Sequence, residues 1–184
     1  PGVILRKTPR RGESMAAASQ VEVSIRDVEP TDVEVFYQQQ LDPEASRRAV
    51  FPVRERDRFT AKWKEILADE EILVQTVLVD GEIAGNFVCW QQSGRRWVGY
   101  WFGREYWGRG AATRGLKLFL ERAPWRPLYA DPATRNVGSV RVLEKCGFQV
   151  VEKLVRPSLL DGEDVEHVVF ALDARQESAT PAKK

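Results

Sequence analysis

The sequence predicts a mixed α+β fold with a central, mostly antiparallel sheet of about seven strands and about four flanking helices. Three observations lead to this prediction. Three consecutive segments alternate apolar and polar residues between glycine turns, which is typical of antiparallel strands. Segments with helical spacing stand before and after this block. Two further alternating segments close the chain around an Asp-Gly turn.

The predicted element order is β-α-α-β-β-β-α-β-α-β-β. The strands cover residues 21–28, 72–79, 82–92, 95–102, 127–131, 148–160 and 163–172. The helices cover residues 29–40, 52–70, 110–123 and 135–147. Apolar residues alternate along each strand and recur every three to four positions along each helix.

Short turn signals set the ends of several elements. Asp80-Gly81 between two alternating segments predicts a tight hairpin, and Ser93-Gly94 turns the chain again. Gly147 after the last helical pattern is typical of a helix C-terminus. Asp161-Gly162 predicts the turn between the last two strands.

The ends of the chain differ from this patterned middle. Residues 1–19 and 174–184 are mostly small, polar or charged, and we expect both segments to be disordered. Met15 is the only methionine, which is compatible with a start codon preceded by residues foreign to the natural protein. Residues 20–173 then form one domain, a size that can bury a substantial core.

Composition excludes several classes of protein. Twenty-eight Lys and Arg against 27 Asp and Glu leave a net charge of +1, so no general attraction to nucleic acids or anionic membranes is expected. No apolar run approaches the roughly 20 residues of a membrane span. Cys89 and Cys146 have neither disulfide-framework nor zinc-site spacing, so we expect packed thiols, no metal and a cytoplasmic protein.

The stretch "REYWGRGAATRGL", residues 104–116, follows a strand directly and opens a helix. The first N–H groups of a helix lack partners, and glycines let the backbone approach a ligand closely. This arrangement predicts a phosphate or pyrophosphate nest. The alternative is a tight connection with solvated arginines, and glycine spacing alone does not decide between them. A nucleoside triphosphatase loop would need Gly-Lys-Ser or Gly-Lys-Thr, and a dinucleotide fingerprint would need a parallel unit.

Three motifs together resemble the GNAT acyltransferase superfamily. They are "GREYWGRGAATRGL", "ADPATRNVGSVRVLEKCGFQ" and "LLDGEDVEHVVFAL". Within that superfamily they are most similar to the ribosomal-protein N-terminal acetyltransferase branch. The resemblance covers about residues 20–173, and the motifs stand in the expected order on the expected elements.

The resemblance implies acetyl-coenzyme A, or a similar acyl form, as a cosubstrate and an amine as acceptor. Arg104 is expected to replace a contact that relatives make from the position of Glu105. The residues implied in coenzyme binding are Trp101, Phe102, Gly103, Arg104, Trp107, Gly108, Arg109, Gly110, Ala111, Ala112, Thr113, Asn136, Ser139, Arg141 and Lys145.

The strand before the glycine turn is implied to hold the pantetheine arm through its main chain, like an added strand. Gly99 there suits a β-bulge that parts this strand from its neighbour, or else gives packing room under Trp97 or Trp101. By family analogy, the main-chain N–H of about Trp101 stabilises the oxyanion.

Catalytic candidates follow from the need for a base and an acid. Ser139 is the candidate to contact or protonate the sulfur, or else it packs or caps its helix. Relatives often carry a tyrosine at the position of Leu143 and a glutamate at Trp97, and this chain departs at both. The base stays open among Glu166, His167, Tyr100, Glu70 and ordered water. Glu166 and His167 are adjacent in a strand, so only one of them can face the cleft.

The acceptor side is expected near residues 42–58 and the tryptophans of the central strands. Trp90, Trp97 and Trp101 could wall an acceptor cleft. The arginines of residues 42–58 have two interpretations. They bind an acidic group, on the acceptor or on a succinyl-like acyl chain, or they form a solvated run of charges. We favour the solvated run. These arginines are Arg47, Arg48, Arg54, Arg56 and Arg58.

The expected function is an N-acyltransferase that moves acetyl, or alternatively succinyl, from acyl-coenzyme A to a primary amine such as a protein N-terminus or a small molecule. The departures at Leu143 and Trp97 support the alternative of a catalytically silent acyl-coenzyme A-binding or regulatory domain. A nucleotide-dependent enzyme is a third hypothesis. A homodimer is compatible with the sequence, although no pattern specifies one.

Overall fold

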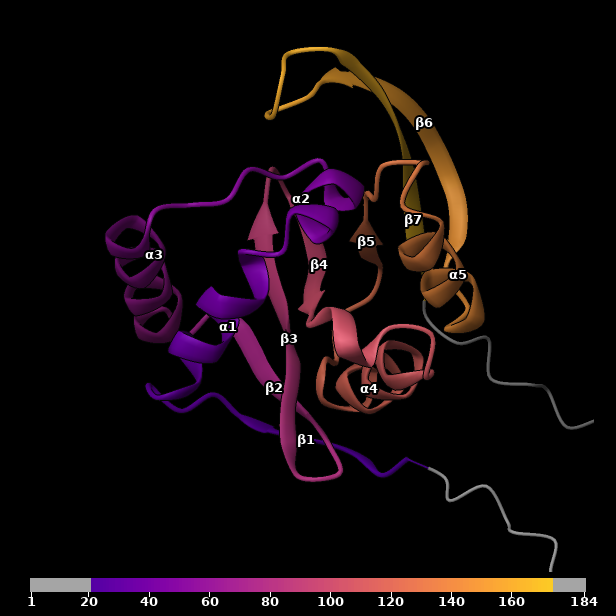
Figure 1. Ribbon diagram of the computed structural model, residues 1–184. Coiled ribbons are helices and arrows are strands. Elements are labelled where there is room, and N and C mark those ends of the chain that lie inside the picture. Colours follow the sequence, from indigo (N-terminus) through magenta and orange to yellow (C-terminus); the bar gives the residue numbers. More distant parts are fainter. Residues whose placement is uncertain (1–20, 174–184) are drawn as a thin grey trace, which may run out of the picture.

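The computed structural model describes residues 21–173; the ends predicted to be disordered, residues 1–19 and 174–184, lie outside this range, as does residue 20 of the predicted domain. Its seven strands form one sheet in the order β1-β2-β3-β4-β5-β7-β6 (Figure 1). All neighbouring strands pair antiparallel except β4 and β5, which are parallel. This architecture confirms the predicted α+β class and the mostly antiparallel sheet.

The elements follow the predicted order with two additions, the helices α2 and η1. The strands are β1 Val23–Asp27, β2 Leu73–Val79, β3 Glu82–Gln92, β4 Arg95–Phe102, β5 Leu128–Ala130, β6 Gln149–Pro157 and β7 Asp164–Leu172. The α-helices are α1 Asp32–Gln40, α2 Pro43–Ala49, α3 Arg56–Ala68, α4 Ala111–Arg122 and α5 Val137–Lys145. A short 3₁₀ helix, η1, covers Arg104–Tyr106.

Helix α2 was not predicted, and residues 42–58 are therefore not one continuous loop. The side chain of Asp42 accepts hydrogen bonds from the N–H groups of Glu44 and Ala45, and Pro43 occupies the first helical position. These are strong helix-start signals. The helix ends after seven residues at Val50, which adopts a left-handed backbone with φ 54°. A helix of two turns leaves too short an apolar pattern to be read from periodicity.

The predicted tight turns are confirmed by their backbone. Asp80-Gly81 and Ser93-Gly94 all have positive φ, as a two-residue turn that matches strand twist requires. Gly147 has φ 89°, and Phe148 donates its N–H to the carbonyl of Leu143, which closes helix α5.

The last hairpin is shorter than predicted. Strand β6 ends at Pro157 rather than at residue 160, because a loop over residues 158–163 replaces the two-residue turn. Ser158 donates its N–H to the carbonyl of Glu163, and Gly162 donates to the carbonyl of Ser158. The Asp161-Gly162 pair therefore lies inside a wider loop.

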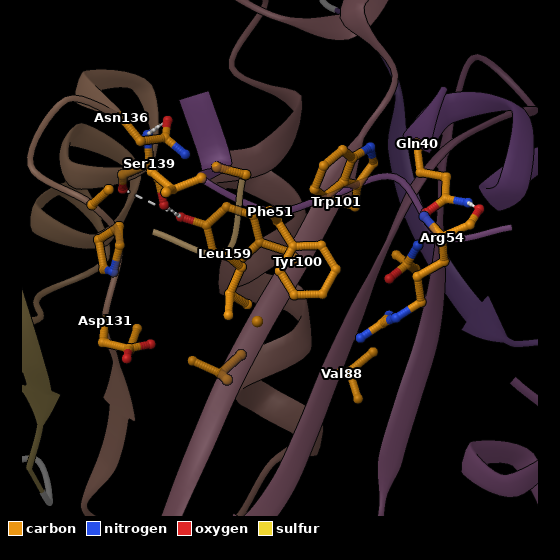
Figure 2. A pocket seen from close by; sticks show the side chains of 18 of the residues that line it. Gln40, Phe51, Arg54, Val88, Tyr100, Trp101, Asp131, Asn136, Ser139 and Leu159 are labelled. Carbon is orange, nitrogen blue, oxygen red and sulfur yellow. Dashed lines mark hydrogen bonds between the residues drawn. The ribbon is translucent and has the colours of Figure 1, made fainter. Parts of the chain in front are cut away.

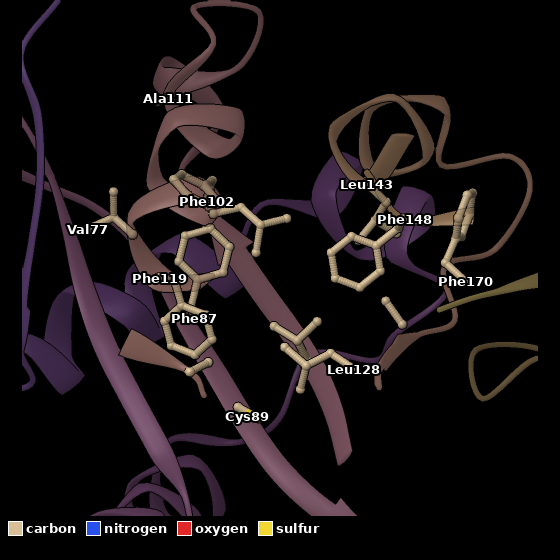
Figure 3. Close-up of a cluster of buried hydrophobic side chains, with 14 of the residues drawn as sticks. Val77, Phe87, Cys89, Phe102, Ala111, Phe119, Leu128, Leu143, Phe148 and Phe170 are labelled. Atoms are coloured by element: carbon tan, nitrogen blue, oxygen red, sulfur yellow. The ribbon is translucent and has the colours of Figure 1, made fainter. Parts of the chain in front are cut away.

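Each face of the sheet carries its own core. On one face, α4 and α5 cover a cluster that includes Phe87, Phe119 and Leu143 (Figure 3). On the other face, α1 and α3 bury Phe36 and Trp63 against β2 and β3. Successive strand residues point to opposite faces, so both cores share β3. The candidate functional site lies beside β4, at the place in the sheet where β4 separates from β5.

Candidate active site

Strands β4 and β5 part in the middle of the sheet. They pair only at Arg96 with Leu128 and Trp97 with Tyr129, so β4 has no β5 partner from Val98 onward. The β3–β4 register continues without a shift through Gly99, so the predicted bulge at Gly99 is absent. The separation comes from the short length of β5 instead. Polar main-chain groups on one edge of β4 are thereby left without a strand partner.

Gly99 has a packing role. A Cβ built at this position would lie 3.2 Å from Cζ3 of Trp90. The ring that needs the space is therefore Trp90, rather than Trp97 or Trp101 as expected. A larger residue at position 99 would push on that ring.

The main chain of β4 presents alternate residues to the gap. Gly103 donates its N–H to the carbonyl of Ala84, at the β3 side of the strand, over 3.0 Å. Because donors alternate along an antiparallel strand, the N–H of Trp101 also points toward β3. The N–H groups of Tyr100 and Phe102 then point toward the gap. Trp101 is thus misplaced as the predicted oxyanion donor, and its neighbours have the suitable direction.

The glycine turn lies at the C-terminal end of β4 and opens α4. Gly108 and Gly110 have φ of 73° and 75°, and Gly110 is the N-cap residue. The first helical acceptor is the Gly110 carbonyl, which takes the N–H of Arg114. The N–H groups of residues 111–113 precede that first bond and have no partner within the helix. The turn therefore has the left-handed glycines and free donors of an anion nest.

Two of the side chains predicted beside this nest have other partners. Arg104 lies with its Nε 3.6 Å from Oδ2 of Asp42, and Trp107 donates its indole N–H to the carbonyl of Phe102. Arg104 thus ties the turn to α2 and is not a free cation at the nest. Arg109 is exposed beside Gly110, and Arg141 and Lys145 are exposed on α5. No hydrogen bond or ion pair engages these three side chains within the described residues.

A hydroxyl pair joins β4 to α5 across the gap (Figure 2). The hydroxyl of Tyr100 lies 2.7 Å from Oγ of Ser139 and 3.2 Å from the Ser139 carbonyl. Asn136 caps α5, and its Oδ1 accepts the N–H of Ser139 at 3.2 Å. Asn136, rather than Ser139, therefore caps the N-terminus of α5, so the Ser139 hydroxyl is not used in capping. Burial raises the pKa of Tyr100, and the hydrogen bond with Ser139 offsets only part of that rise. Tyr100 therefore stays protonated, so it can donate a hydrogen bond but is not suited to act as the base.

Comparison with known proteins identifies the family. Residues 22–149 match the profile of the "Acetyltransferase (GNAT) domain" family, about 70% of the chain. The chain belongs to the GNAT acetyltransferase family. A search of curated protein sequences returns no significant match.

Solved structures share the GNAT fold with this chain. A GNAT-family acetyltransferase from Bacillus anthracis has a TM-score of 0.71 at 17% identity, with 82% of this chain and 94% of that chain covered. RimJ from Mycobacterium smegmatis, solved with CoA-disulfide, has a TM-score of 0.70 at 21% identity, with 86% and 85% covered. Spermidine N-acetyltransferase from Vibrio cholerae, solved with CoA and spermine, has a TM-score of 0.73 at 15% identity, with 82% and 95% covered.

The GNAT domain has a cavity of about 640 Å³ on the α1–α3 side of the sheet. It begins at the gap and extends over β3 toward α3. Gap residues that line it include Gly99, Tyr100, Trp101, Asn136 and Ser139. Two of the three predicted wall tryptophans, Trp90 and Trp101, also line it, whereas Trp97 packs against Tyr129 at a ring-centroid distance of 5.6 Å.

His167, rather than Glu166, lines this cavity. Glu166 is exposed outside it, as is the other predicted candidate Glu70. Nδ1 of His167 lies 2.9 Å from the carbonyl oxygen of Asp131. A carbonyl only accepts, so Nδ1 carries the hydrogen, and Nε2 of the neutral ring keeps a lone pair. Of the two base candidates on the last strand, only His167 therefore lines the cavity, and strand register is what distinguishes the two.

The GNAT domain uses most of the arginines of residues 42–58 in local contacts. Arg47 and Arg48 pair with Glu44, and Arg56 pairs with Glu34. These pairs agree with the favoured interpretation of a solvated charge run. Arg58 is exposed, and Arg54 is the one of these five arginines that lines the cavity.

The residues of the gap and turn fit coenzyme A. The nest supplies donors for a pyrophosphate, and the unpaired edge of β4 can pair with an extended amide chain. Within residues 21–173, no group of three or more His, Cys, Asp or Glu side chains is arranged to hold a metal ion. None of the helices in that range has the length and apolar character of a membrane span.

Cys89 is buried and Cys146 half-buried, and neither is in a disulfide.

Leu143, where relatives often carry a tyrosine, is fully buried in the core. A tyrosine hydroxyl is nevertheless present in the gap, that of Tyr100 on β4. Sequence reasoning named Tyr100 as a base candidate but missed its pairing with Ser139, because nothing local links two residues 39 positions apart.

Proposed function

We propose that this protein transfers an acetyl group from acetyl-coenzyme A to a primary amine, such as a protein N-terminus or a small-molecule amine. One observation carries the proposal: the nest, the unpaired edge of β4 and the Tyr100–Ser139 pair follow one another around a single gap that opens into a cavity. The order matches the order of pyrophosphate, pantetheine and thioester in the donor.

The donor is held by main-chain groups and by cations at the nest. Gly108, Gly110 and the N–H groups of residues 111–113 would bind the pyrophosphate. Arg109 beside Gly110, and Arg141 and Lys145 on α5, are exposed and would add positive charge for the phosphates of coenzyme A. When bound, acetyl-coenzyme A supplies the activated thioester carbonyl that an amine can attack.

The edge of β4 stabilises charge at that carbonyl oxygen. The N–H of Tyr100 or of Phe102 points into the gap, and a fixed main-chain dipole needs no reorganisation during reaction. We favour Tyr100, because the cavity lining reaches Tyr100 and does not include Phe102.

We assign to the Tyr100–Ser139 pair the protonation of the departing sulfur of coenzyme A. If the Tyr100 hydroxyl donates to Oγ of Ser139, the Ser139 hydroxyl is free to donate toward the gap. Ser139 then acts as the proton donor and Tyr100 orients it. Asn136 fixes the first turn of α5 that carries Ser139.

His167 is the base that we propose for the incoming amine. An ammonium group cannot attack, so a proton has to leave before the carbon–nitrogen bond forms. Nε2 of His167 has a lone pair directed away from Asp131, and the ring lines the same cavity as Ser139. Proton transfer takes place directly or through one water molecule.

Two structural neighbours bear on the class of acceptor and on the branch of the family. Among the structural neighbours, one is named ribosomal L7/L12 α-N-protein acetyltransferase and another ribosomal-protein-S5-alanine acetyltransferase, at 14% and 17% identity. These names and the motif resemblance support a protein N-terminus as acceptor and the ribosomal-protein branch. Acetyl is favoured over succinyl by the same names. We further propose a cytoplasmic location, no nucleic-acid or membrane partner, and a homodimer as an open option.

Incubation of the purified chain with acetyl-coenzyme A and a panel of primary amines tests the proposal. Free thiol release is followed with a thiol-reactive dye, and mass spectrometry shows the acetylated amine. Turnover of at least one amine is expected. Binding of coenzyme A by calorimetry without turnover of any amine would favour the silent binding domain instead. Stabilisation by ATP or NAD but not by coenzyme A would favour a nucleotide-dependent enzyme.

A further inference from the structure

One charged side chain of the cavity has no role in the steps above. Arg54 follows α2 and lines the cavity opposite the gap. Its guanidinium lies over the ring of Phe51, 4.6 Å from the centroid. Within residues 21–173, no carboxylate pairs with it, in contrast to Arg47, Arg48 and Arg56 nearby.

The main chain of Arg54 is held in place by a buried amide. The side chain of Gln40 donates to the carbonyl of Arg54 at 2.9 Å and accepts its N–H at 3.2 Å (Figure 2). Gln40 is only 5% exposed. From this anchor the Arg54 side chain extends toward Val88 (Figure 2). Although the residue as a whole is exposed, burial lowers the pKa of its guanidinium.

The charge of the cavity is positive. Its lining holds three cationic side chains, Arg54, Lys62 and Arg156, and one carboxylate, Asp131. Arg156 is paired with Asp131 at 2.6 Å, and Lys62 reaches Glu65 at 3.1 Å. Arg54 is thus the cation of this lining that is left without an acidic partner. A protonated amine or a polycation entering this space is repelled, unless it also carries negative charge.

We infer that the acceptor is an amine that also carries a carboxylate, and that Arg54 is the residue that binds this carboxylate. The inference rests on the proposed function, since it names the class of its acceptor. A guanidinium fork suits a carboxylate, and Phe51 holds its plane. We assign the carboxylate to the acceptor rather than to the acyl chain, because Arg54 belongs to the α2–α3 segment and the thioester is expected at the β4–α5 gap.

Matched amine pairs test this inference. Each pair differs only in a carboxylate or its amide: glycine and glycinamide, 4-aminobutyrate and 4-aminobutyramide, and tripeptide amides with glutamate or glutamine at the second position. Spermine is the polycation. The natural chain is expected to acetylate the carboxylate member of at least one pair with a kcat/KM roughly 10- to 100-fold above that of its amide, the worth of a charge-assisted contact.

Two substitutions separate charge from shape. Arg54→Met removes the charge and is expected to abolish the preference by raising KM for the carboxylate member, while the amide member is little changed. Arg54→Lys is expected to keep part of the preference. Lys64→Met, an exposed position on α3 outside the cavity, is the matched control for net charge and should leave the preference intact. Retained calorimetric binding of coenzyme A shows that each variant is folded.

The outcomes are distinguishable. Equal or better turnover of amides or spermine overturns the inference and leaves the proposed function standing. A carboxylate preference that survives Arg54→Met also overturns it. A preference for succinyl- over acetyl-coenzyme A with neutral amines, lost in Arg54→Met, would move the carboxylate to the acyl chain and overturn the assignment to the acceptor. No turnover with any amine removes the proposed function, and the inference falls with it.

Discussion

At the scale of single residues, the site depends on one contact that spans two elements. Tyr100 on β4 and Ser139 on α5 share a hydrogen bond of 2.7 Å, and burial keeps Tyr100 protonated by raising its pKa. The Tyr100 hydroxyl is therefore a weak acid, and its hydrogen bond to Ser139 fixes its orientation. In the proposed mechanism this hydroxyl orients Ser139.

Ser139→Ala is expected to lower kcat by about 10- to 100-fold, because the departing thiolate loses its proton donor. Tyr100→Phe should lower kcat less, and the double variant should be little worse than Ser139→Ala, since the two residues act as a unit. Steady-state kinetics and the Kd for coenzyme A measure these effects. Ser24→Ala, an exposed serine on β1, is the control. An unchanged kcat in Ser139→Ala would remove Ser139 from the mechanism.

His167→Asn is expected to lower kcat/KM by roughly 100-fold near pH 7, because the amide nitrogen can replace Nδ1 in the hydrogen bond to the Asp131 carbonyl but cannot accept a proton from the substrate amine. For an acceptor with a free N-terminus, the deficit should shrink at about pH 9, where the amine has already lost its proton to solvent. The measurement is a pH profile of the natural chain and the variant. A deficit that is the same at both pH values would indicate a structural role only.

At the scale of elements, the decisive feature is the junction of β4, η1 and α4. Gly108 and Gly110 both adopt left-handed backbone, and this turns the chain so that the first donors of α4 are free. The parting of β4 from β5 leaves the donors of Tyr100 and Phe102 on the same side. Main-chain N–H groups therefore supply most of the hydrogen bonds that we propose to hold acetyl-coenzyme A.

Gly110→Ala is expected to weaken coenzyme A binding about tenfold, because a Cβ at φ 75° costs roughly 1–2 kcal/mol and the backbone can relieve that strain by turning its donors away. Calorimetry measures the Kd. Gly81→Ala is the matched control, since Gly81 has φ 86° in the β2–β3 turn with no atom within 4 Å of an added Cβ. It should lose similar stability and keep the Kd. Equal Kd values for the two variants would argue against the nest.

At the scale of the whole molecule, a buried carboxylate ties the first helix to the sheet. Asp32 on α1 is 1% exposed and accepts two hydrogen bonds from Arg26 on β1, at 2.6 and 2.8 Å, and one from Thr76 on β2 at 2.6 Å. Burial by itself would raise the pKa of Asp32, but the bonds from Arg26, Thr76 and the N–H of Glu29 outweigh it and lower the pKa. The network holds α1, and through it the cavity wall, in place.

Asp32→Asn is expected to reduce the free energy of unfolding by about 3 kcal/mol at pH 7, because Arg26 loses its charged partner. Since the folded pKa of Asp32 lies below its unfolded value of about 4, its contribution is complete above about pH 5 and is lost as the pH falls below the unfolded pKa and through the lower folded one. Urea unfolding at several pH values should show the gap between natural chain and variant closing in that window. Glu121→Gln, exposed on α4, should show no such change. A gap independent of pH would mean that the Asp32 charge does not stabilise the fold.

Local patterns in the sequence determined the order of the strands and longer helices, the first two hairpin turns and the glycine turn. These features depend on residues a few positions apart, where periodicity and positive φ are decisive. The family motifs added the class of donor. The short helix α2 was missed because two turns leave little periodic signal, and the bulge at Gly99 was wrong because register depends on the partner strand.

Only the tertiary structure decided which side chains meet. Strand register turned His167 into the cavity and Glu166 out of it, and it turned the N–H of Trp101 toward β3. Packing of α5 against β4 brought Ser139 to Tyr100. The physical reason is that the direction of a strand residue and the partner of a buried hydroxyl are set by contacts distant in the chain, which no local pattern encodes.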